Sequence, residues 1–174
     1  MAMRRELSSR NAFLTVIQIM NALKKKHTIL DYAIFGSMAT MRYTQTFPTG
    51  DLDLVVVLRY KKLIDLSPVW REFRNKGHTW TEQHLLVEGI PVEIMVADRL
   101  EEEAVKTANR VSVSGLRTKV PKPEYLIAMA VRAGRQKDRF KVNLLLQQTS
   151  TNSHLLQSLL KRFGLTERFE TWVK

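Results

Sequence analysis

The stretch from residue 31 to residue 58, DYAIFGSMATMRYTQTFPTGDLDLVVVL, constrains the fold more than any other part of the chain. It opens with an apolar run that breaks at Gly36 and Ser37, and it ends in an Asp-Leu-Asp triplet followed by an unbroken apolar run. Each apolar run has the length and composition of a buried β-strand. Side chains alternate along a strand, so Asp51 and Asp53 are predicted to share one face of the second strand.

The polar residues of this stretch favour phosphate and metal chemistry. Two carboxylates on one face repel each other unless a divalent cation such as Mg²⁺, which prefers hard oxygen ligands, lies between them. Gly36 permits close backbone approach, and N–H groups at the start of a helix suit a phosphate. Arg42 is either a further phosphate ligand or an exposed or acid-paired residue. A lone Gly-Ser or a lone Asp-x-Asp is commonly a turn, so the prediction depends on their combination.

The order strand, Gly36-Ser37, helix, turn, Asp51-x-Asp53, strand resembles the sequence signature of the nucleotidyltransferase superfamily, which has the polymerase-beta-like fold. The Thr-Gly pair before the first Asp resembles the small stand-alone bacterial members, some of which occur in abortive-infection and toxin–antitoxin systems. The resemblance implies that both aspartates bind Mg²⁺ (or Mn²⁺) and that the glycine and serine hold a nucleoside triphosphate.

The same resemblance implies a third carboxylate on a neighbouring strand. Glu93, in the run IPVEIMV, matches that position. In the superfamily this group helps to bind the catalytic metal and accepts the proton of the attacking hydroxyl. The alternative is an exposed glutamate on a half-buried strand, where its charge stays in water.

Residues 123–139 carry a second resemblance, to the nucleotidyltransferases of the abortive-infection type. It implies that Arg135, Lys137 and Asp138 line the nucleotide side of the cleft, although Lys137 and Asp138 are alternatively an ordinary exposed pair. Ala130 stands where a Lys is common, and Arg132 is a candidate for the missing charge. The residues that fit the pattern are Pro123, Glu124, Leu126, Ala128, Arg135, Lys137 and Asp138.

Composition indicates the class of partner. The formal net charge of +11 and the pI of about 10.1 predict attraction to nucleic acid or to nucleotides. The chain has no cysteine, so it has no disulfide framework and no thiolate metal site. No apolar run reaches about 18 residues, and the first residues lack the apolar core of a signal peptide, so we expect a cytoplasmic protein without membrane contact.

The patterns predict one compact α/β (α+β) unit. Residues 1–120 form a nucleotidyltransferase core with an N-terminal helix and a small mixed, twisted sheet of four to five strands flanked by helices. Residues 121–174 form a helical segment that closes the cleft, and the Pro-Lys-Pro sequence at its start marks the boundary with the core. The predicted helices are 6–26, 68–76, 124–133, 137–148, 153–163, 166–173 and one capped by Asp98. The predicted strands are 29–35, 52–58, 78–87 and 90–96, and residues 110–120 form either a last strand or a hairpin around Gly115.

The function implied is a metal-dependent nucleotidyltransferase that moves a nucleoside monophosphate from a triphosphate to an acceptor hydroxyl. The acceptor is RNA, tRNA, a protein side chain or a small molecule. The first alternative is a catalytically silent member that binds nucleic acid or a cognate partner protein, and Ala130 favours it. The second is a metal-dependent nuclease, which the Gly-Ser pair disfavours because hydrolysis needs no triphosphate cradle.

Overall fold

The computed structural model describes residues 2–59, 64–81 and 84–173, and within these ranges the side chains from Arg10 onward. The strands are β1 (Ile29–Ile34), β2 (Leu52–Leu58), β3 (Thr79–Trp80), β4 (Leu85–Val87), β5 (Ile90–Val96), β6 (Asn109–Val113) and β7 (Leu116–Val120). The helices are α1 (Ala2–Lys25), α2 (Gly36–Thr40), α3 (Ser67–Asn75), α4 (Arg99–Thr107), α5 (Pro123–Ala133), α6 (Gln136–Gln148), α7 (Ser153–Arg162) and α8 (Thr166–Val173).

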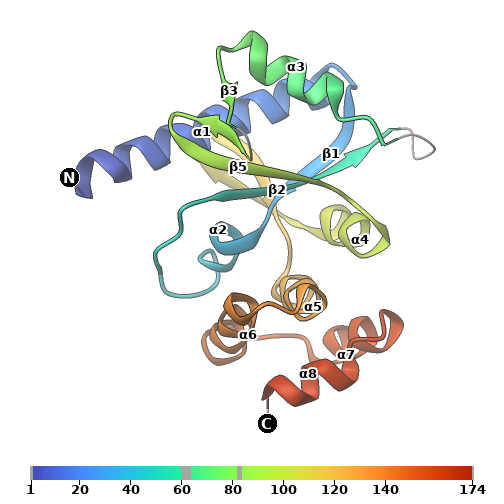
Figure 1. The fold of residues 1–174 in the computed structure, drawn as a ribbon. Coiled ribbons are helices and arrows are strands. Elements are labelled where there is room, and N and C mark those ends of the chain that lie inside the picture. Colours follow the sequence, from blue (N-terminus) through green and yellow to red (C-terminus); the bar gives the residue numbers. More distant parts are fainter. Residues whose placement is uncertain (1, 60–63, 82–83, 174) are drawn as a thin grey trace.

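The strands confirm the predicted mixed sheet. Five of them form one sheet in the order β1-β2-β5-β4-β3, and β6 and β7 form a separate hairpin. β1 and β2 are antiparallel, whereas β2 and β5 are parallel. In Figure 1, α1 and α3 lie on one side of the sheet, and α2, α4 and the helices α5 to α8 lie on the other. The face of the sheet opposite to α1 and α3 is therefore turned toward the C-terminal helices.

The core is built from the apolar runs that the sequence analysis identified. Leu54, Val55 and Val56 of β2 are fully buried because both faces of this central strand are covered. Ile17 of α1 and Phe73 of α3 are also fully buried. Burying an apolar side chain of this size stabilises the fold by about 1.5–3 kcal/mol, so these residues fix the sheet in place.

The C-terminal helices pack directly on the core of the fold. α5 begins with Pro123, which suits the first helical turn, and it ends at Gly134 in the left-handed conformation, with φ of +74°. Most of α5 is buried, and it contacts α2, α4, α6 and α7. Residues 123–133 thus form one wall of the space beneath the sheet.

One predicted strand is wrong in its extent. The sequence analysis predicts a single strand over 78–87, but β3 and β4 are two short antiparallel strands. The N–H of Thr81 donates to the carbonyl of His84, and only β4 contributes to the core, because Leu85 and Val87 are buried whereas both residues of β3 are exposed. None of the described helices is long and apolar enough to cross a membrane.

Asp31 ties three elements together and gives a testable pH dependence. Its carboxylate accepts from Lys24 Nζ at 2.6 Å and from Lys119 Nζ at 2.5 Å. Burial alone would raise the pKa of Asp31, but the hydrogen bonds from Lys119 and Lys24 outweigh burial and lower it below 3.8. A carboxyl with a lowered folded-state pKa stabilises the fold above its unfolded pKa and loses this effect as the pH falls.

We expect Asp31→Asn to lower the free energy of unfolding by about 2 kcal/mol near neutral pH. The difference from the wild type should shrink as the pH falls below 3.8 toward the folded-state pKa. Denaturant unfolding of both proteins over this pH range measures it. A difference that stays constant with pH would mean that the charge of Asp31 contributes nothing.

Candidate functional site

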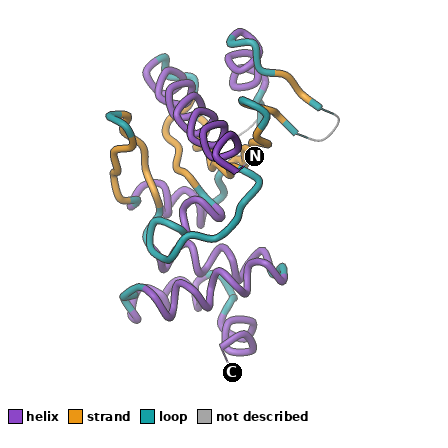
Figure 2. The backbone as a smooth tube through the Cα atoms, turned by 90° about the vertical axis from the view of Figure 1, so that its left-hand side faces the viewer, coloured by secondary structure: helices purple, strands orange, loops and turns teal. Residues whose placement is uncertain are grey.

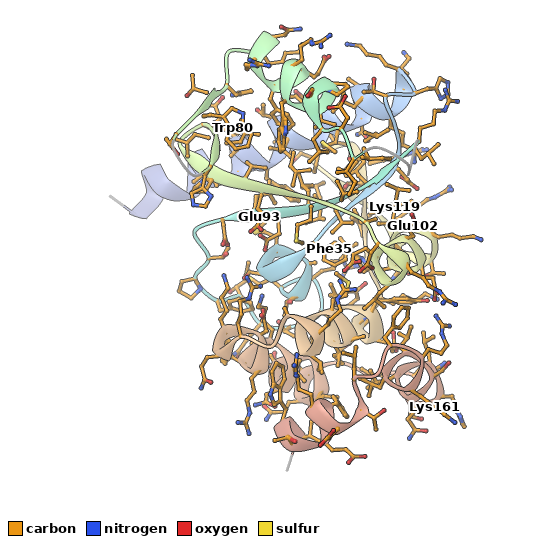
Figure 3. All side chains as sticks on the ribbon, turned by 45° about the vertical axis from the view of Figure 1, so that its right-hand side comes forward. Phe35, Trp80, Glu93, Glu102, Lys119 and Lys161 are labelled. Carbon is orange, nitrogen blue, oxygen red and sulfur yellow. The ribbon has the colours of Figure 1, made fainter. Side chains whose placement is uncertain are left out.

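Asp53 and Glu93 lie side by side on neighbouring strands. β2 and β5 run parallel, and their register pairs Asp53 with Glu93. Leu52 and Leu54 are buried, so the strand alternation places Asp53 on the opposite face, as predicted. Glu93 and Phe35, both labelled in Figure 3, lie where the sheet meets the C-terminal helices. The two carboxylates therefore project into the same space beneath the sheet.

Asp51 adds a third negative charge. It directly precedes β2, and Thr49 Oγ1 donates to its Oδ1 at 2.9 Å. The pKa of Asp53 is raised, first by burial and then by the charges of Asp51 and Glu93. Such a cluster of carboxylates attracts cations, and its oxygen donors are those that Mg²⁺ prefers. As the side chains stand, however, no three acidic or histidine groups in the described ranges are arranged to hold a metal ion, so these carboxylates would have to turn toward a shared ion.

Gly36 fits closely against Asp53. Its φ is +59°, a backbone conformation that favours glycine, and a Cβ on it would overlap Asp53 Oδ2 and lie 2.6 Å from Asp53 Cγ. The N–H of Phe35 donates to the carbonyl of Asp53 at 2.8 Å, which fixes the separation. Ser37 follows in the first turn of α2 and is half-buried. The structure thus brings Gly36 and Asp53 together from positions far apart in the motif.

A cavity of about 330 Å³ opens between the sheet and the C-terminal helices. Its lining joins the carboxylates of β2 and β5 to cations of α6 and to an apolar wall from α5. The residues that line it are Phe35, Gly36, Thr40, Asp53, Glu93, Met95, Glu101, Leu126, Met129, Ala130, Arg132, Ala133, Arg135, Asp138 and Lys141. Both motifs that the sequence analysis identified contribute to this one cavity.

Two cations share one buried carboxylate at the α6 side of the cavity. Asp138 is 1% exposed and accepts from Arg135 Nε at 2.6 Å and from Lys141 Nζ at 2.9 Å. Burial alone would raise the pKa of Asp138, but the hydrogen bonds from Arg135 and Lys141 lower it. One positive charge is left over at the cavity wall, which is the electrostatic requirement for binding an anion.

The sequence analysis missed Lys141. This residue is only 7% exposed and lines the cavity. Its positive charge counteracts part of the rise in the pKa of Asp53. The available signal was its spacing, because a residue three positions after Asp138 lies on the same face of a helix. A basic residue on that face suggested a buried ion pair rather than an exposed one.

Of the remaining predicted cations, Lys137 and Arg42 are not in the lining of the cavity, whereas Arg132 is. Lys137 is exposed but close enough for its positive charge to counteract part of the rise in the pKa of Asp53. Arg42 is exposed, with its guanidinium 6.0 Å from the ring centroid of Tyr43. Arg132, the candidate for the missing charge, lines the cavity, but its guanidinium is paired with two acids. These acids are Asp98, at 2.7 Å, and Glu101.

Comparison with solved structures identifies the fold. An antigenic nucleotidyltransferase-like protein from Paracoccidioides brasiliensis matches with a TM-score of 0.55 at 20% identity, over 95% of this chain and 93% of that one. The antibiotic-resistance factor ANT(2'')-Ia matches with a TM-score of 0.52 at 12% identity, over 90% of this chain and 92% of that one. Its complex with adenylyl-2''-tobramycin matches with a TM-score of 0.53 at 13% identity, over 89% and 97%. No family model and no curated protein matches. The chain has the nucleotidyltransferase fold.

Proposed function

We propose that this chain, which has the nucleotidyltransferase fold, transfers a nucleoside monophosphate from a nucleoside triphosphate to an acceptor hydroxyl. The observation that carries the proposal is the cavity in which Gly36, Asp53 and Glu93 face Arg135 and Lys141. Carboxylates on one wall and a surplus cation on the other are what a metal-bound triphosphate requires, because both its cation and its phosphates then have partners.

In the proposed reaction the acceptor oxygen attacks the α-phosphorus of the triphosphate. A phosphorus–oxygen bond forms there while the bond from the α-phosphorus to the bridging oxygen breaks, and pyrophosphate leaves. Glu93 is exposed on β5, so an acceptor can reach it, and its carboxylate takes the hydroxyl proton. Arg135 and Lys141 stabilise the negative charge that develops on the leaving pyrophosphate.

The carboxylates define the cation that fits. Asp51, Asp53 and Glu93 offer only oxygen donors, and we propose that they hold Mg²⁺ or Mn²⁺, which when bound would stabilise charge on the phosphoryl oxygens as a Lewis acid. The carboxylate of Asp53 packs against the backbone of Gly36, and Gly36 and Ser37 would hold the triphosphate through backbone N–H groups and the serine hydroxyl. Arg42, Lys137 and Asp138 complete the proposed nucleotide surroundings, with Asp138 acting through the two cations that it positions.

The first test is a thermal shift of the full chain with each nucleoside triphosphate, with and without Mg²⁺. A ligand that binds only the native state raises the unfolding temperature, so we expect a Mg²⁺-dependent rise with one nucleotide. The rise should be absent in the Asp51→Ala/Asp53→Ala variant. Labelled triphosphate and total RNA then test transfer, which lengthens or labels the acceptor. No rise with any triphosphate would overturn the proposal in favour of a catalytically silent binding protein, and shortening of the RNA would indicate a nuclease.

Lys141→Met should weaken donor binding. Loss of a charge-assisted contact of about 2 kcal/mol corresponds to roughly a 30-fold rise in KM for the triphosphate. Steady-state kinetics measures it, and Lys161→Met, which removes a charge from the exposed surface of α7, is the matched control. Asp138 keeps Arg135 as a partner in the variant, so the fold should persist. An unchanged KM would remove Lys141 from the donor site.

A further inference from the structure

The chain segment between Glu103 and Glu124 contains no acidic residue, and all of its charged residues are cations. Most of this segment is the β6-β7 hairpin, which none of the proposed chemistry uses. Figure 2 shows the hairpin as a pair of orange strands at the left, outside the main sheet. The cations of the segment are Lys106, Arg110, Arg117, Lys119 and Lys122.

The register of the hairpin puts its basic residues on one face. Arg110 pairs with Lys119, and Ser112 pairs with Arg117, so these residues share a face. The residues of the opposite face pack on the core. Like charges directly opposite each other destabilise a sheet. Lys119 is neutralised by Asp31, but Arg110 and Arg117 remain exposed and form no ion pair with any side chain that the structure describes, that is, from Arg10 onward.

One end of this face is extended by a cation from another element. At the tip, Arg10 of α1 donates to Ser114 Oγ at 3.2 Å. At the base, Asn109 lies on the opposite face, which packs on the core, and its Nδ2 donates to the hydroxyl of Tyr43 at 3.0 Å. Three arginines therefore lie along the hairpin from its base to its tip; this hairpin stripe consists of Arg110, Arg117 and Arg10.

The turn holds this arrangement in place. Ser114 has φ of +49° and Gly115 has φ of +82°, the two left-handed positions of a primed two-residue turn. The base is fixed because the Tyr43 hydroxyl donates to the carbonyl of Pro121 at 2.9 Å. The arginines of the strands are thus presented on a rigid ribbon rather than on a mobile tail.

We propose that the hairpin stripe binds the phosphate backbone of a nucleic acid. Its exposed groups are guanidinium and hydroxyl donors, which are the usual partners of phosphate oxygens. The exposed face offers no aromatic or aliphatic anchor of the kind that dominates protein–protein interfaces. None of the three arginines lines the cavity, so the stripe is a separate surface. Resting on the proposed function, it would hold the body of a polynucleotide acceptor whose terminal hydroxyl reaches Glu93.

The test is fluorescence anisotropy of labelled RNA and of duplex DNA with the full chain, over a series of salt concentrations. We expect Arg110→Ala/Arg117→Ala to bind RNA about 10- to 100-fold more weakly, and the slope of log K against log salt to fall by about 2, because two phosphate contacts are lost. Equal losses for RNA and DNA would show that the stripe binds the phosphate backbone that both share. A loss for RNA alone would show that it binds RNA specifically.

The matched control is Arg71→Ala/Arg74→Ala, which removes the same charge from exposed positions of α3. An equal loss in both pairs would overturn the proposal, because binding would then follow net charge alone, and so would the absence of binding by the wild type. Arg110→Lys/Arg117→Lys keeps the charge and should retain most of the affinity.

The thermal shift with triphosphates separates this inference from the proposed function. Neither Arg110 nor Arg117 lines the cavity, so the shift should be unchanged in the double variant. A wild type that binds RNA through the stripe but shows no triphosphate shift would retain the stripe and refute nucleotidyl transfer. A triphosphate shift with no stripe-dependent RNA binding would refute the stripe and retain the proposed nucleotidyl transfer.

Discussion

Asp53→Asn should abolish nucleotidyl transfer while leaving the protein as stable as the wild type or more so. The variant loses a negative charge at the centre of the carboxylate cluster, and we expect transfer to fall on the order of 10³-fold, equivalent to about 4 kcal/mol of transition-state stabilisation. The raised pKa of Asp53 means that its ionised form is disfavoured in the folded state, because of burial and of Asp51 and Glu93. A neutral amide removes that cost.

The pH dependence has a definite sign. A carboxyl whose folded-state pKa is raised destabilises the fold at pH values where it is ionised, so the gain in unfolding temperature from Asp53→Asn should be present near neutral pH and vanish below 3.8. Thermal unfolding over this pH range measures the gain in unfolding temperature. Repeating it with Mg²⁺ tests metal binding, since Mg²⁺ should stabilise only the wild type. Full transfer activity in the variant would refute the assignment of Asp53, and a large fall in unfolding temperature would refute the electrostatic cost.

Gly36→Ala should be the most disruptive single methyl group in the site. An alanine at φ of +59° costs about 1–2 kcal/mol, and its Cβ would overlap the carboxylate of Asp53. The backbone cannot move away freely, because the Phe35 N–H is bonded to the Asp53 carbonyl. We expect a loss of about 2–4 kcal/mol in unfolding free energy and a loss of transfer similar to that of Asp53→Asn. Denaturant unfolding and a transfer assay measure the two effects.

Gly50→Ala is the matched control for this substitution. A Cβ on Gly50 would meet nothing within 4 Å, so stability and transfer should stay close to those of the wild type. The double variant Gly36→Ala/Asp53→Ala removes the carboxylate that the new methyl overlaps, and it should recover part of the stability without recovering transfer. If Gly36→Ala were as stable as the wild type, the close approach to Asp53 would have no energetic role.

Local sequence patterns were sufficient for most of the secondary structure. The alternation of β2 placed Asp53 opposite to its buried neighbours, and the predicted N-cap at Asp98 is present, with its Oδ1 accepting from the N–H of Leu100. The sequence left open whether residues 110–120 form one strand or a hairpin around Gly115, and the structure has the hairpin. In the one wrong strand, 78–87, polar residues separate Trp80 from the apolar run at the end, and periodicity alone does not distinguish such a segment from a continuous strand.

The sequence by itself determined which residue types carry the proposed chemistry: glycine, paired aspartates, a glutamate and a basic helix in the order of the nucleotidyltransferase signature. Only the tertiary structure decided which cations complete the cavity. Arg132 is held by Asp98 and Glu101, whereas Lys141 is buried against Asp138 and faces the carboxylates. The reason is physical. Side-chain chemistry and strand or helix period are local properties, but the partner of a charge depends on how α4, α5 and α6 pack together.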